Sequence, residues 1–158
     1  MTMNEKRARK YPDTEYFHFY NANPKGKMTE DCVVRAITTV LKQPYEQTLR
    51  ELAEMTIKTG YMLNGNKGIE VYMKSKGWTK CKQPKKEDGT KYTGKEFCLK
   101  LQHPLYSDEL NLTDKGFELN NILINIGGHH TVAVMGCQIW DTWNSSSGSV
   151  GIVWVKNV

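Results

Sequence analysis

Residues 27–41 read KMTEDCVVRAITTVL, and this stretch predicts a helix that begins beside a cysteine. Thr29 is a suitable N-cap. Glu30 and Asp31 then complement the helix dipole in the first turn, which also holds Cys32. The apolar residues that follow recur at helical spacing; they are Val33, Val34, Ile37, Val40 and Leu41. This helix is therefore expected to bury one face in a core.

The rest of the chain divides into helices followed by strands. Further helices are predicted for residues 45–60, 68–77 and 93–101. In the first of them the expected inner stripe consists of Leu49, Leu52, Ala53 and residues 55–57. Short strands are predicted for residues 15–23, 120–128, 130–135, 138–143 and 151–156. The expected fold class is α+β, with N-terminal helices packed against a C-terminal antiparallel sheet. Residues 1–15 are expected to be a flexible basic segment, and residues 16–158 a single domain.

Composition narrows the class of protein. The 158 residues are 39% hydrophobic and 25% charged, as in ordinary globular proteins. No apolar run is long enough for a membrane span, and the basic N-terminus has no apolar core of a signal peptide. A cytoplasmic protein without a membrane partner is expected. Four scattered cysteines without a CxxC pair predict reduced thiols, with no metal site and no cofactor.

Cys32 has two interpretations. Free cysteine is often a small buried residue, which suits a core helix. Alternatively, the unpaired N–H groups and the dipole of a helix N-terminus lower the pKa of a thiol and favour a nucleophilic thiolate. The helix by itself leaves both interpretations open.

A histidine and an aspartate further along favour the nucleophile. In GGHHTVAVMGCQIWDTW, residues 127–143, His130 opens an apolar strand and Asp141 follows eleven residues later on the next strand. A hairpin turning near Gly136 brings both to the same open end, where a carboxylate can hold an imidazole that faces a thiol. His130 as a strand-end residue and Asp141 as a turn residue remain alternatives, and Asn144 is a rival third member.

The order of these residues resembles the papain-like cysteine peptidase superfamily. The segments DCVVRAI, HHTVAV and QIWDTWNSS are similar to those of small peptidase-like proteins of bacteriophages and bacterial mobile elements. The resemblance implies a papain-like fold over residues 16–156, with Cys32 as nucleophile, His130 as general base and acid, and Asp141 as orienting residue.

The papain-like pattern leaves some roles without an obvious residue. No glutamine precedes Cys32 in residues 21–31 to form an oxyanion hole. Asn23 is the best amide donor there, with the backbone N–H of Cys32 as second donor. Trp143 and Asn144 are expected beside the substrate. Glu30 and Asp31 are expected to face solvent, because inward carboxylates would oppose a thiolate. Cleft walls are expected from residues 60–68 and 103–121.

Three functions follow from these patterns. The first is a thiol hydrolase acting on a peptide, isopeptide or other amide bond of a protein or peptide substrate. The second is a phage-encoded protein of the same fold that has lost catalysis and binds a host protein. The third, weaker alternative is nucleic-acid binding through the lysine-rich residues 80–100, where Tyr92 and Phe97 interleave with the charges.

Overall fold

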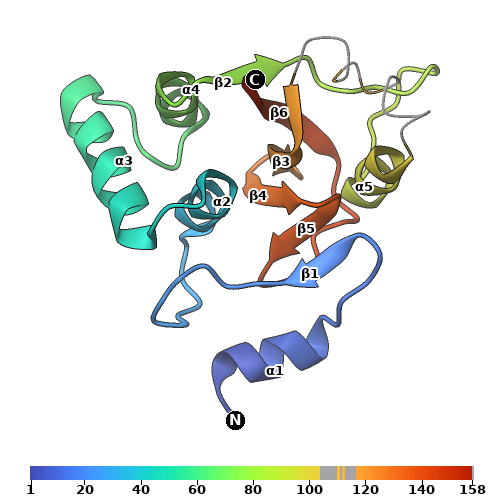
Figure 1. The fold of residues 1–158 in the computed structure, drawn as a ribbon, viewed down its shortest axis with the longest axis horizontal. Coiled ribbons are helices and arrows are strands. Elements are labelled where there is room, and N and C mark those ends of the chain that lie inside the picture. Colours follow the sequence, from blue (N-terminus) through green and yellow to red (C-terminus); the bar gives the residue numbers. More distant parts are fainter. Residues whose placement is uncertain (104–109, 111, 113–116, 158) are drawn as a thin grey trace.

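The structure is a computed structural model in which residues 1–103, 110, 112 and 117–157 are described (Figure 1). Its helices are α1 Met3–Lys10, α2 Cys32–Leu41, α3 Tyr45–Thr59, α4 Asn66–Ser75 and α5 Gly94–Gln102. Its strands are β1 Phe17–Phe19, β2 Trp78–Cys81, β3 Phe117–Ile126, β4 His130–Met135, β5 Gln138–Asp141 and β6 Val150–Asn157. The predicted α+β class is confirmed, with the helices mostly N-terminal and the sheet largely C-terminal.

The strands form one sheet in the order β1-β5-β4-β3-β6-β2. Consecutive strands β3, β4 and β5 pair antiparallel, but β1 pairs parallel with β5, from Phe17 beside Ile139 to Phe19 beside Asp141. The sheet is therefore mixed, not purely antiparallel as predicted. Hairpin-connected strands must run antiparallel, whereas β1 is separated from β5 by most of the chain and is free to take either direction.

Helices cover both faces of this sheet. α2 and α4 lie on one face, α2 over β4 and α4 beside β2, with α3 packed against both helices, and α5 lies on the opposite face (Figure 1). Because side chains alternate along a strand, β4 turns Ala133 toward α2 and turns Val132 and Val134 toward α5. Two apolar cores result, one on each face. The small Ala133 leaves room for α2 to pack directly on β4.

The helix boundaries correct two predictions. α2 begins at Cys32, and Asp31, not Thr29, is its N-cap residue, without a capping hydrogen bond from its side chain. In α3 only Leu52 of the predicted stripe is buried, whereas Leu49 is 41% and Ile57 85% exposed. The apolar period of α3 is real, but only its middle faces α2 and α4.

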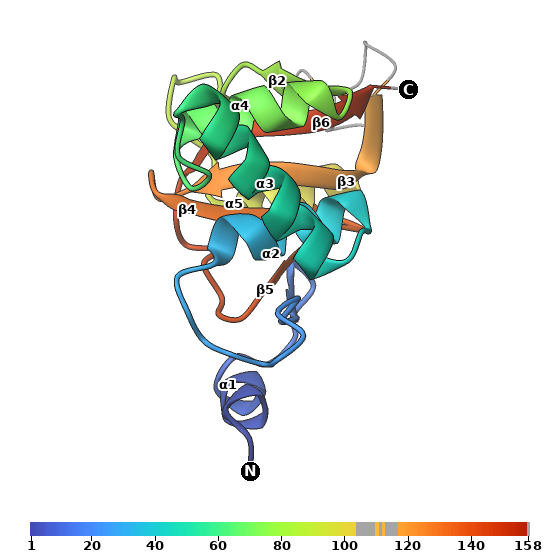
Figure 2. The same cartoon turned by 90° about the vertical axis from the view of Figure 1, so that its left-hand side faces the viewer.

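The N-terminal segment contains a helix that the sequence did not predict. α1 buries no residue and lies apart from the two layers (Figure 2). Polar contacts hold it, since Asn21 Nδ2 donates to Asn4 Oδ1 over 3.0 Å and Arg7 Nε donates to the Thr142 carbonyl over 3.1 Å. The flexibility of residues 1–15 and the single domain over 16–158 stay predictions.

Candidate active site

Three elements bring the predicted catalytic residues together. Cys32 is the first residue of α2, His130 the first of β4 and Asp141 the last of β5. The β4–β5 hairpin turns between Met135 and Gln138, so His130 and Asp141 meet at its open end. Since α2 packs on β4, its N-terminus carries Cys32 to the same end of the sheet. The residues predicted as a triad therefore lie side by side.

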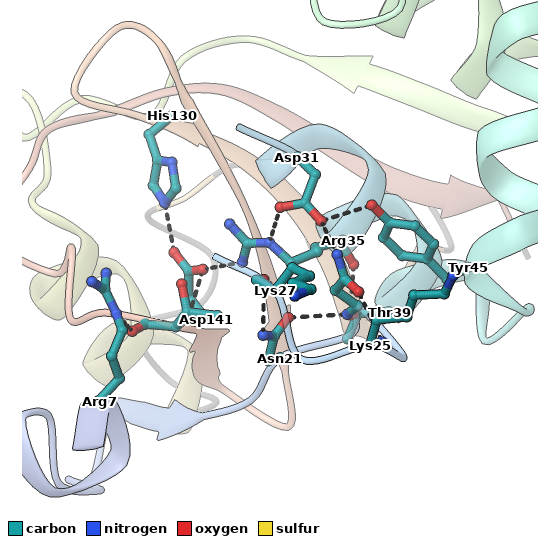
Figure 3. A network of polar contacts seen from close by, with 12 residues as sticks. Arg7, Asn21, Lys25, Lys27, Asp31, Arg35, Thr39, Tyr45, His130 and Asp141 are labelled. Carbon is teal, nitrogen blue, oxygen red and sulfur yellow. Dashed lines mark hydrogen bonds and ion pairs between the residues drawn. The ribbon is translucent and has the colours of Figure 1, made fainter. Parts of the chain in front are cut away.

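His130 and Asp141 form a close, largely buried pair. His130 Nε2 lies 2.5 Å from Asp141 Oδ2, and the two side chains are 18% and 3% exposed (Figure 3). Burial by itself lowers the pKa of His130, but the hydrogen bonds to Asp141 and Cys32, with the negative charges of both groups, raise it to about 9. The imidazole is therefore held in its protonated form near neutral pH.

Cys32 is the second partner of this imidazole. It hydrogen-bonds to His130, and because Asp141 occupies Nε2, the ring nitrogen left for the thiol is Nδ1. Burial raises the pKa of Cys32, but the hydrogen bonds from His130 and from the Thr131 backbone, then the charges of His130 and Arg35, bring it below its ordinary value. The two opposite shifts favour a thiolate–imidazolium pair.

A buried arginine completes the site, and the sequence reading missed it. Arg35 Nη1 donates to Asp141 Oδ1 over 2.7 Å, and Arg35 Nε donates to Asp31 Oδ1 over 2.8 Å (Figure 3). Asp31 is 9% exposed, so the expectation that it faces solvent was wrong. The guanidinium neutralises this carboxylate, which is why it is tolerated beside a thiol. A charged residue inside the apolar run VVRAI, four residues after an aspartate, was the available signal.

Asn23 belongs to this buried network and not to the cleft. Asn23 Nδ2 donates to Asp31 Oδ2 over 3.1 Å, and the Tyr45 hydroxyl donates to the same oxygen over 2.7 Å. Burial and the Asp31 carboxylate raise the pKa of Tyr45 to about 12. The structure thus gives the Asn23 amide a partner other than substrate, and its oxyanion role stays a prediction.

A cleft of about 510 Å³ gives access to the thiol and the imidazole. Trp143 forms part of its wall and lies with its ring centroid 4.9 Å from that of His130. Leu63 and Asn64 line it from the expected 60–68 wall, whereas much of the expected 103–121 wall lies outside the described residues. The Asn144 side chain accepts from the Ser146 backbone in a local turn and does not line the cleft.

Two other cysteines lie in surroundings different from those of Cys32. Cys98 is fully buried in the α5 core, and burial raises its pKa to about 12. Cys137 lies in the β4–β5 turn with a φ of 66°, and burial raises its pKa as well. In the described structure, neither Cys98 nor Cys137 has the histidine partner that Cys32 has.

The lysine-rich stretch carries mixed charge in the folded chain. Lys86 pairs with Glu96 over 2.5 Å, and Lys80 lies 3.9 Å from Glu70. These carboxylates offset part of the positive field that nucleic-acid binding would use. Nucleic-acid binding stays a prediction.

No family model, curated protein or solved structure matches this chain. Across the described ranges, no helix has the length and apolarity needed to cross a membrane. Over the same residues, no group of three or more His, Cys, Asp or Glu side chains is placed to hold a metal ion.

Proposed function

We propose that this protein is a papain-like thiol hydrolase of the cytoplasm that cleaves a peptide, isopeptide or other amide bond. The observation that carries the proposal is the continuous chain of hydrogen bonds from Cys32 through His130 to the buried Asp141, open to a cleft at the thiol. A structural cysteine needs neither a charged histidine partner nor access to a cleft.

The geometry supports nucleophilic catalysis in two stages. The Cys32 thiolate attacks the substrate carbonyl carbon, and the carbonyl electrons move to oxygen. His130 Nδ1 gives its proton to the leaving amine as the C–N bond breaks, which leaves a thioester. His130 then takes a proton from water, whose hydroxide attacks the thioester and releases the acid and the thiolate. Asp141 at Nε2 stabilises the imidazolium throughout.

The start of α2 supports the role of an oxyanion hole. The first N–H groups of a helix have no acceptor within it, so the Cys32 N–H is available to the oxygen that becomes charged. Asn64 is an amide side chain that also lines the cleft. It takes the place that the sequence assigned to Asn23 as a candidate second donor.

The first test is the pH dependence of iodoacetamide labelling at each cysteine, mapped by mass spectrometry. We expect Cys32 to react rapidly below about pH 7, because its thiolate is stabilised by the imidazolium. In His130→Ala the fast labelling is expected to move toward the pH of an ordinary thiol, near 8.5. Labelling of wild-type Cys32 only at that higher pH would sink the proposal. If it passes, amide and isopeptide substrates are screened against wild type and Cys32→Ala.

A second candidate function is binding to another protein, with or without catalysis. The outer side of α3 and the loop after it expose Leu49, Ile57, Tyr61 and Met62, with Ile57 85% and Met62 61% exposed. Exposed apolar side chains gathered in one region favour a protein partner. An unreactive Cys32 together with capture of a partner that is lost in Ile57→Lys would favour this function over hydrolysis.

A further inference from the structure

The N-terminal helix contributes one charged side chain to the cleft. Arg7 lines it together with Cys32 and His130 and is half-buried, whereas Arg9 on the same helix is exposed and does not line it. The Nε of Arg7 donates to the Thr142 carbonyl over 3.1 Å, next to the cleft residue Trp143. This bond holds the guanidinium at the cleft wall.

The rest of that guanidinium is available to a ligand. Within the described residues, Arg7 has the Thr142 hydrogen bond and a position 5.7 Å from the Tyr11 ring centroid, and no carboxylate pairs with it. Arginine presents its N–H donors as a planar fork that matches a carboxylate. The anchored Nε leaves the terminal nitrogens as the donors for such a group.

The other charged residues that the structure describes in the cleft do not form ion pairs with the Arg7 guanidinium. Arg35 contacts Asp31 and Asp141, and His130 contacts Asp141 and Cys32, so these charged groups pair with one another and none of them pairs with Arg7. Glu30 is an exposed carboxylate in the lining, and His129 is an exposed imidazole there. Glu30 opposes an anion, but neither it nor His129 forms an ion pair with Arg7 in the described structure. Arg7 is thus the unpaired permanent cation among the described residues of the cleft.

We propose that Arg7 is an anion-binding residue of this cleft and that the preferred substrate carries a carboxylate close to the bond that is cleaved. This inference rests on the proposed hydrolase function and names its substrate class. Acidic peptides are the substrates of this chemistry. The unusual feature is that α1, which buries no side chain of its own, supplies the specificity.

The test needs no known substrate, because two alkylating agents of similar size differ in charge, and their ratio compared between variants cancels the difference in their intrinsic reactivity. Iodoacetate carries a carboxylate and iodoacetamide is neutral; with both, the Cys32 thiolate forms an S–C bond and iodide leaves. We measure the two second-order rate constants at Cys32, at pH 6.5 and low salt, and compare their ratio between variants. In Arg7→Gln we expect the iodoacetate/iodoacetamide ratio to fall about two- to fivefold, the range of a partly exposed ion pair.

Arg9→Gln is the matched control, since it removes the same charge from the same helix outside the cleft. Its ratio is expected to equal that of wild type, and Arg7→Lys, which keeps the charge, is expected to fall between wild type and Arg7→Gln. The imidazolium also attracts iodoacetate, so only the change between variants counts. Equal ratios in wild type and Arg7→Gln, or equal losses in Arg7→Gln and Arg9→Gln, overturn the inference. Slow labelling of wild-type Cys32 by both agents would instead refute the hydrolase proposal.

Discussion

Arg35 and His130 bind opposite oxygens of one buried carboxylate. Arg35 Nη1 lies 2.7 Å from Asp141 Oδ1, and His130 Nε2 lies 2.5 Å from Asp141 Oδ2. Arg35 stands on α2, nearly one turn after Cys32, so the helix that carries the thiol is tied directly to the carboxylate that orients the imidazole. The ion pair therefore sets the position of the nucleophile relative to its base.

Removing Arg35 is expected to destabilise the fold strongly. Arg35→Gln leaves the buried Asp31 without its cation and leaves Asp141 with His130 alone, and breaking a buried pair in this way costs about 3–5 kcal/mol. The measurement is the free energy of unfolding from urea titration. Arg50→Gln is the control, because it breaks an exposed pair with Glu46 on α3 and should leave stability nearly unchanged. Equal effects of the two substitutions would contradict the role of Arg35.

Asp141→Asn is expected to lower the pKa of His130 from about 9, because an amide does not balance the imidazolium charge. The pKa of Cys32 then rises, which lowers the thiolate fraction at pH 6 by up to about tenfold for each unit of rise. The measurement is the iodoacetamide rate at Cys32 across pH 5–9. Asn144→Ala tests the rival third residue and is expected to keep the wild-type profile. The opposite pattern would assign the orienting role to Asn144.

His130 and Cys32 contribute to stability in opposite ways as the pH changes. The raised pKa of His130 contributes stability that is present below the unfolded value of 6.5 and lost as pH rises toward about 9. The lowered pKa of Cys32 contributes stability that is present above its unfolded value of 9.0 and lost as pH falls through the folded value. At pH values above 6.5 and above the folded pKa of Cys32, but below about 9, the folded and unfolded chains each hold one proton on this pair. Its contribution to wild-type stability is therefore nearly flat there.

Cys32→Ser removes that compensation. The folded variant still protonates His130 beside Asp141, so its stability is expected to fall with rising pH above 6.5, with a slope of up to about 1.4 kcal/mol per pH unit. Urea midpoints at pH 6, 7, 8 and 9 measure it. The double variant Cys32→Ser/His130→Gln measures how all other titrating groups change stability with pH. It should lack the additional slope that His130 causes in Cys32→Ser. The same slope in both variants would show that His130 titrates as it does in the unfolded chain.

Gly94 at the start of α5 is expected to reject a side chain. A Cβ there would lie 2.7 Å from Ile126 Cδ1 and 2.9 Å from Ile139 Cδ1, both buried. Helix propensity by itself predicts that Gly→Ala stabilises the protein, whereas the steric contacts predict that it destabilises the protein. The sign of the change in the free energy of unfolding therefore shows which effect dominates. We expect Gly94→Ala to destabilise by about 1–3 kcal/mol.

The matched rescue is Ile126→Val, which removes the nearer methyl group. We expect the Gly94→Ala penalty in the Ile126→Val background to be smaller than in wild type, measured as a coupling energy in a double-mutant cycle. A penalty that is independent of residue 126 would show that backbone change at the helix start, and not this contact, is responsible.

Much of the fold could be read from local patterns because local physics decides it. The period of VVRAITTVL and the capping box at Thr93–Glu96 correctly predicted buried and capped helices, and Gly60 does end α3 in the left-handed region. The hairpin near Gly136 was predicted from its turn and apolar alternation. Errors arose where burial depends on neighbours. The outer residues of α3 are apolar but meet no partner, and β1 found its place beside β5 through long-range pairing.

The sequence by itself determined that a cysteine lies in the first turn of a helix, that a histidine opens a strand and that an aspartate lies on the next one. Each of these depends on residues close in the chain, through capping, periodicity and turn chemistry. Only the tertiary structure decided that α2 packs on β4 closely enough for the thiol to reach the imidazole, that Arg35 links Asp31 to Asp141, and that Arg7 reaches the cleft from α1. Those contacts join residues up to 135 positions apart, and their free energy arises from burial and charge pairing that no local pattern records.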